Sequence, residues 1–141
     1  VTESGPPLPD PFLSASLEDA WRVAWGLDGT RPAGAPSTRM GPVFRWLAAA
    51  YPTRRMGLVA MTGDATLAAF LGLPLTGTGS LSEGLAQLRR DLAPSANASF
   101  FYVWSVEQTF IHKAPSAWPA HWAPPFDDGE TLSHFVSRQL Q

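Results

Sequence analysis

Residues 99–106 read Ser-Phe-Phe-Tyr-Val-Trp-Ser-Val, and they are the most informative stretch for the fold. Aromatic and β-branched residues occupy both odd and even positions here, as in a strand whose two faces are both covered. We therefore expect residues 99–106 to form the centre of a small sheet. A second apolar run, Gly-Leu-Val-Ala-Met-Thr at 57–62, predicts another strand.

Two helices with clear capping signals are expected between these strands. Asp64 is placed to cap a helix over residues 65–71, which Gly72 would end. Ser80 and Glu83 have the spacing of a capping box at the start of a second helix. Four leucines then form one stripe along that helix, namely Leu81, Leu85, Leu88 and Leu92.

Three further helices are expected outside this central region. Ser16 would cap a helix that ends at Gly26, with Trp21 and Trp25 facing inward. The apolar residues 43–51 predict a helix that is buried on most sides. Near the C-terminus, Asp128 would cap a helix whose buried face consists of Leu132, Phe135, Val136 and Leu140.

These elements predict an α+β fold, with four to five helices packed on a small mixed sheet. Residues 1–15 are rich in proline and have no helical or strand period, so we expect a disordered tail there. Residues 16–141 should then form a single compact globular domain, since a chain of 141 residues has the usual size for one core.

The composition is unusual in its balance of charged and aromatic residues. Charged residues make up only 16% of the chain, against roughly 25% in a typical soluble domain. The chain also has six tryptophans and eight phenylalanines, which is more aromatic area than we expect one core to cover. A protein partner or self-association is therefore expected.

Charge, cysteine content and hydropathy narrow the other partners and the location. The formal net charge is −2, and no basic cluster exceeds the pairs Arg54-Arg55 and Arg89-Arg90, so nucleic acid is a disfavoured partner. No apolar run is long enough to span a membrane, and no export signal is visible. Because the chain has no cysteine, a reducing compartment is expected, namely the cytoplasm.

A proline-rich segment at residues 114–126 contains the candidate binding residues. Four prolines here alternate with Trp118, His121, Trp122 and Phe126, which predicts a semi-rigid aromatic ribbon. Such a ribbon loses little entropy on docking and suits a recognition surface, although the same residues could cover the protein's own core. The leading hypothesis is a non-catalytic protein–protein interaction module, either homodimeric or bound to another protein.

Two other functional classes remain open from the sequence. A small-ligand-binding protein or enzyme would use His112 or His121 with a carboxylate, but the histidine spacings match no metal motif and no catalytic motif is present. We therefore assign no catalytic residue, metal or cofactor. Residues 66–91 resemble a helix-turn-helix, which would suit a DNA-binding regulator. However, the turn is longer than usual, and the second helix, which would contact DNA, offers only Arg89 and Arg90, both at its far end. The loop at residues 77–80 could also receive an anion at a helix N-terminus.

Overall fold

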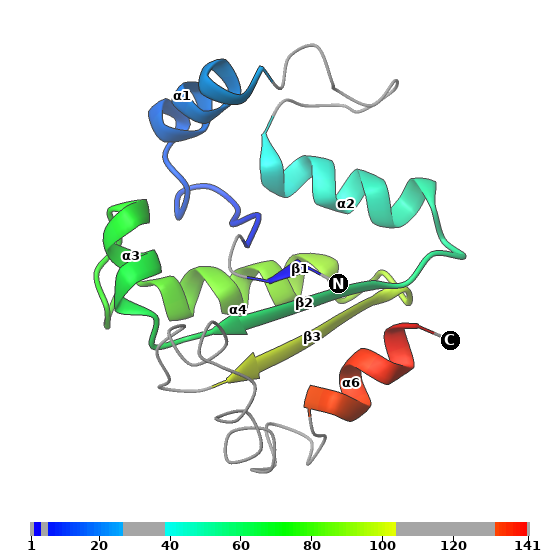
Figure 1. The fold of residues 1–141 in the computed structure, drawn as a ribbon. Helices are drawn as coiled ribbons and strands as arrows, with labels where there is room; N and C mark the ends of the chain where they lie inside the picture. Colours follow the sequence, from blue (N-terminus) through cyan, green and yellow to red (C-terminus); the bar gives the residue numbers. More distant parts are fainter. Residues whose placement is uncertain (1, 4–5, 27–38, 104–131, 141) are drawn as a thin grey trace.

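The computed structural model describes residues 2–3, 6–26, 39–103 and 132–140. Within these residues the chain forms five helices and a small parallel sheet, which confirms the predicted α+β class (Figure 1). None of the helices in these ranges is long and apolar enough to cross a lipid bilayer.

The described strands form a parallel sheet in the order β1-β2-β3. Their bounds are Thr2–Glu3 for β1, Met56–Met61 for β2 and Ala98–Val103 for β3. Among the described strands β2 is therefore the central one, so within these ranges the central position expected for residues 99–106 is not confirmed. Helices cover both faces of β3, which explains its apolar residues at odd and even positions. Coverage of the two faces does not show how many strands pair along the edges of a strand.

The connection from β2 to β3 runs through two helices whose caps match the predicted ones. Helix α3 (Ala65–Leu71) begins where the Asp64 carboxylate accepts a hydrogen bond of 2.7 Å from the backbone N–H of Leu67. Helix α4 (Leu81–Leu92) begins at the predicted cap, Ser80, in a variant of the capping box in which Glu83 binds the residue before the cap. The Ser80 hydroxyl accepts from the N–H of Glu83 at 3.3 Å, and the Glu83 carboxylate accepts from the N–H of Gly79 at 2.6 Å. The four leucines of the predicted stripe are all buried.

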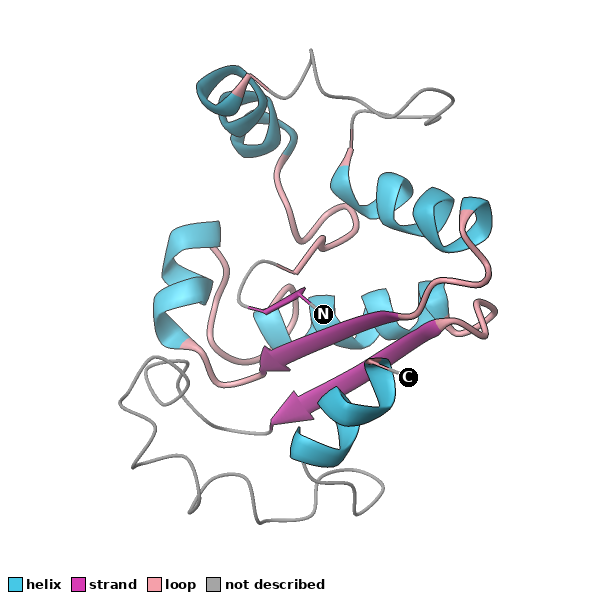
Figure 2. Ribbon diagram, turned by 45° about the vertical axis from the view of Figure 1, so that its right-hand side comes forward, coloured by secondary structure: helices cyan, strands magenta, loops and turns pink. Residues whose placement is uncertain are grey.

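Helices cover both faces of the sheet (Figure 2). Leu58, Ala60 and Tyr102 point into the larger core, which α2, α3, α4 and the N-terminal segment complete. On the other face, Val59, Met61 and Phe101 pack against Phe135 of α6 (Leu132–Gln139). This alternation follows from the period of two along a strand.

Helix α6 lies close to its face of the sheet, but the residue after its end does not. Phe135 is fully buried, and a Cβ at Gly57 of β2 would lie 3.0 Å from the Gln139 side chain, so α6 approaches the sheet closely at that glycine. Leu140 follows the end of this helix and is 80% exposed. The expectation that Leu140 belongs to the buried face is therefore wrong.

The N-terminal segment packs into the core, whereas the sequence predicts a disordered tail up to residue 15. Leu8, Phe12 and Leu13 are buried in the larger core, and β1 pairs with β2. The segment reaches the core without a helical or strand period, since residues 6–13 lie outside the regular elements. A search for periodicity cannot detect such packing.

Helices α1 (Ala15–Trp25) and α2 (Met40–Ala50) are joined by a buried carboxylate. The cap of α1 is Ser14, two residues before the predicted Ser16, and its hydroxyl accepts from the N–H of Leu17 at 3.2 Å. Glu18 of α1 accepts a hydrogen bond of 2.8 Å from the N–H of Met40 and one of 2.9 Å from Arg39. This carboxylate raises the pKa of Arg39.

Candidate functional site

The most prominent surface feature among the described residues is a stack of three aromatic rings shared by α1 and α3. The Trp21 ring lies in the middle, with centroids 5.4 Å from Trp25 and 5.4 Å from Phe70. The interplanar angles are 24° and 15°, so both contacts are near-parallel stacks. We call Trp21, Trp25 and Phe70 the aromatic stack. The two helices that carry it lie one above the other at the left of Figure 1.

The helical positions of these residues determine how the stack forms. Trp21 and Trp25 are four residues apart and so lie on one face of α1, which ends where Gly26 adopts a left-handed conformation with φ of 62°. In α3 the buried side consists of Leu67, Ala68 and Leu71. Phe70 lies on the opposite side of that helix and reaches toward α1.

Burial decreases from the middle ring outward. Trp21 is partly buried and packs against the larger core, whereas Trp25 is 57% exposed and Phe70 is 59% exposed. The prediction that both tryptophans face inward is therefore wrong for Trp25, because the last turn of α1 extends beyond the core. Exposed aromatic groups that stack on a partly buried neighbour are typical of binding surfaces.

The charged residues next to the stack on α1 have partners within the protein. Asp19 pairs with Arg22 at 3.3 Å, and Glu18 pairs with Arg39 at 2.9 Å. The Glu18 side chain is only 4% exposed, so its charge contributes little to the surface. These pairs leave the surface beside the rings with balanced charge, and we expect contacts there to be mainly apolar.

The binding residues predicted from the sequence, Trp118, His121, Trp122 and Phe126, lie outside the described residues, as does His112. His134 is exposed on α6. Within the ranges that the structure describes, no three histidine, aspartate or glutamate side chains gather as a metal site. The hypothesis of a ligand site at His112 or His121 therefore stays a prediction.

The helix-turn-helix candidate corresponds to α3 and α4. Together these helices form the connection between the parallel strands β2 and β3, and the leucine stripe of α4 faces the core. Arg89 and Arg90 are exposed near the end of α4. At the start of α4 the Glu83 carboxylate accepts from the N–H of Gly79, so it occupies the place that an anion would take at the 77–80 loop.

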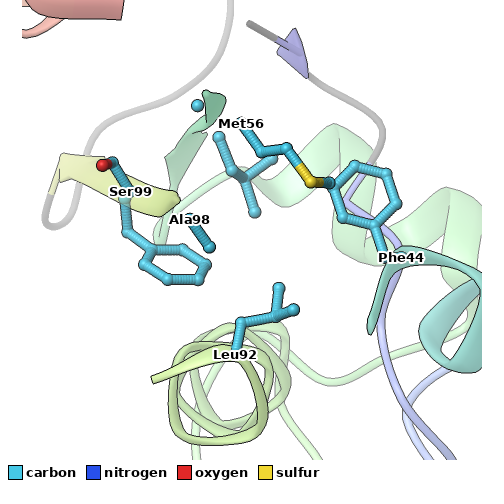
Figure 3. A pocket seen from close by; sticks show the side chains of 8 residues that line it. Phe44, Met56, Leu92, Ala98 and Ser99 are labelled. Atoms are coloured by element: carbon cyan, nitrogen blue, oxygen red, sulfur yellow. The ribbon is translucent and has the colours of Figure 1, made fainter. Parts of the chain in front are cut away.

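A small, partly open cavity lies between α2, α4 and the first residues of β2 and β3 (Figure 3). Its volume is about 10 Å³, and Phe44, Met56 and Leu92 are among the side chains that line it. A site of this size has room for one water molecule at most, and the apolar lining offers such a water no hydrogen bonds. We interpret it as a packing defect and not as a ligand site.

Sequence reasoning missed Phe70 as a surface residue. The signal that could have found it is the face it shares with Thr66 and Ala69, opposite the apolar positions of the same helix. A phenylalanine on the polar side of a short helix needs a partner outside that helix.

Comparisons of the chain with protein-family models, with curated proteins and with solved structures found no match.

Proposed function

We propose that this chain is a non-catalytic protein–protein interaction module and that its partner at the aromatic stack is a second copy of the same chain. One observation supports this most directly. Two aromatic rings are more than half exposed, and both stack on a third ring that packs against the core.

The anchored middle ring favours binding because it limits the entropy lost on association. Each outer ring already lies against Trp21, so fewer side-chain conformations are lost when a partner covers it. Tryptophan is also enriched among the residues that dominate interface energies. The stack therefore has the composition and the rigidity of an interface centre.

Charge and shape favour a second copy as the occupant. Two copies can approach at this surface without strong repulsion, because the net charge is only −2 and the charges on α1 beside the stack are paired. In a symmetric dimer the same patch lies on both sides of the interface. A flat ring face suits this arrangement because it can pack against an identical ring face.

The exposed area predicts a weak and reversible dimer. Each outer ring still exposes on the order of 100 Å², about half of what a buried aromatic side chain covers. At ~25 cal/mol per Å², four such rings contribute about 10 kcal/mol. Association costs about 4–15 kcal/mol. With a cost of ~5 kcal/mol, in the lower part of that range, the remaining gain of about 5 kcal/mol corresponds to a Kd on the order of 0.1–1 mM for the stack alone.

The proposal also includes the ribbon predicted at residues 114–126. Trp118, His121, Trp122 and Phe126 would add apolar contacts to the same kind of interface and would tighten it. A cysteine-free module of this type would act in the cytoplasm.

Sedimentation of the purified chain up to roughly 1 mM tests the proposal. We expect a concentration-dependent monomer–dimer equilibrium that Trp25→Ser and Phe70→Ser each weaken. Tyr51→Ser is the matched control, since Tyr51 is also 50% exposed but its ring contacts Trp46 of α2 and not the stack. This control should leave the equilibrium unchanged.

Two results would contradict this assignment. A chain that stays monomeric over the whole range would overturn the second copy as partner. A dimer that survives both stack variants would overturn the stack as the contact, and Trp118→Ser with Trp122→Ser would then test the ribbon.

A further inference from the structure

A second surface feature, separate from the aromatic stack, is a hollow beside the second half of α4. Its volume is about 330 Å³, and it is lined by Ala86, Arg89, Arg90, Ala93 and Tyr102. Pockets for small molecules occupy roughly 300–1,000 Å³, so the hollow has room for a small ligand. Its lining combines apolar groups with two positive charges.

Arg90 is held in place by a chain of hydrogen bonds along α4. Its Nε and Nη2 atoms donate to the Gln87 side-chain oxygen at 3.3 and 2.7 Å. The Gln87 amide nitrogen donates to Asp91 at 2.7 Å, and Arg45 of α2 donates to the other Asp91 oxygen at 3.2 Å. The Gln87 amide is thus bound at both ends and orients the guanidinium, so Arg90 loses less freedom when it binds an anion.

Tyr102 and Arg89 complete the other side of the hollow. The Tyr102 hydroxyl donates a hydrogen bond of 2.9 Å to the carbonyl oxygen of Leu85, which fixes the ring as a wall. Burial raises the pKa of this hydroxyl, while the nearby charge of Arg89 acts in the opposite direction. The hydroxyl group therefore stays neutral, and Arg89 places its charge close to the same wall.

Arginines in the last turn of a helix complement the negative end of its dipole. The interaction with the helix dipole accounts for the presence of Arg89 and Arg90. It does not explain why Gln87 orients Arg90, or why a hollow lies beside the two arginines. We propose that this hollow binds a small organic anion, a carboxylate or phosphate on an apolar body. The anionic group lies against Arg90, with the charge of Arg89 nearby, and the apolar body lies against Ala86, Ala93 and the small accessible part of Tyr102.

Amide NMR spectra recorded during titration with phenyl phosphate, and separately with benzoate, at low ionic strength test this site. We expect saturable shifts at residues 86–93 and 102. Arg90→Gln should weaken binding about tenfold, as for the loss of one charge-assisted hydrogen bond. Gln87→Ala, which keeps every positive charge, should weaken it several-fold because Arg90 loses its orientation.

Arg54→Gln is the matched control, since it removes one exposed positive charge elsewhere. If Arg54→Gln weakens binding as much as Arg90→Gln, the shifts reflect general charge attraction and the site is overturned. Equal binding of neutral benzyl alcohol would overturn the role of the arginines. Equal binding of inorganic phosphate would overturn the role of the apolar wall.

Discussion

Replacement of Gly84 by alanine tests whether the N-terminal segment packs on α4. Gly84 is buried within α4, and a Cβ atom there would meet the side chain of Phe12. The distances are 2.9 Å to Cγ, 3.0 Å to Cβ and 3.1 Å to Cδ1 of that residue. Contacts this short require the ring or the backbone of the segment to move.

Two effects of opposite sign decide the outcome. Alanine is more favourable than glycine inside a helix by about 0.8–1 kcal/mol. Against this, Phe12 is only 8% exposed and lies close in sequence to Leu8 and Leu13, which are both buried, so the segment has little room to retreat. Overpacking of this kind costs about 1–3 kcal/mol. We expect Gly84→Ala to lower the free energy of unfolding by about 1 kcal/mol.

Urea denaturation followed by circular dichroism measures this change. The same substitution in a Phe12→Ala background is the control, because two of the three close contacts are then absent. In that background the helical preference for alanine should make Gly84→Ala neutral or stabilising. If Gly84→Ala stabilises the otherwise unaltered chain by about 1 kcal/mol, the segment does not pack on α4.

Two further predictions concern single hydrogen-bonding side chains. The Asn97 amide nitrogen donates to the carbonyl oxygens of Ala48, Tyr51 and Arg54 at 3.0–3.1 Å, so Asn97→Ala should cost about 1–3 kcal/mol in urea denaturation. Asn97→Asp should be no more stable than Asn97→Ala, and wild-type stability for it would contradict this role. Burial raises the pKa of Tyr102. The unfolded chain therefore loses this proton first, and stability should fall as the pH rises above about 10. Tyr102→Phe should lose about 1 kcal/mol at neutral pH but decline less steeply above pH 10, and identical alkaline slopes would refute this.

The sequence predicted the elements whose signals are local. Asp64 and Ser80 cap α3 and α4 as predicted, and Gly72 ends α3 in a left-handed conformation with φ of 69°. Each of these signals depends on groups within about one turn of helix. The two strands were also found, because short apolar runs flanked by turn residues are typical of buried strands.

Features that depend on tertiary packing were not predictable in the same way. Leu8, Phe12 and Leu13 become core residues only because α2 and α4 leave space beside them, and no period marks them in advance. The aromatic stack likewise needs α1 and α3 to lie side by side, which neither helix specifies alone. A helical stripe shows which residues share a face, but not what covers that face.

The bond between Glu18 and Met40 has a consequence for the start of α2. Arg39, the residue before this helix, provides no side-chain cap, and the carboxylate that caps it comes from a helix 22 residues earlier. A peptide limited to residues 39–51 would lack this group, so its opening turn should unravel in isolation. The first turn of α2 therefore depends for its stability on a side chain that α1 supplies.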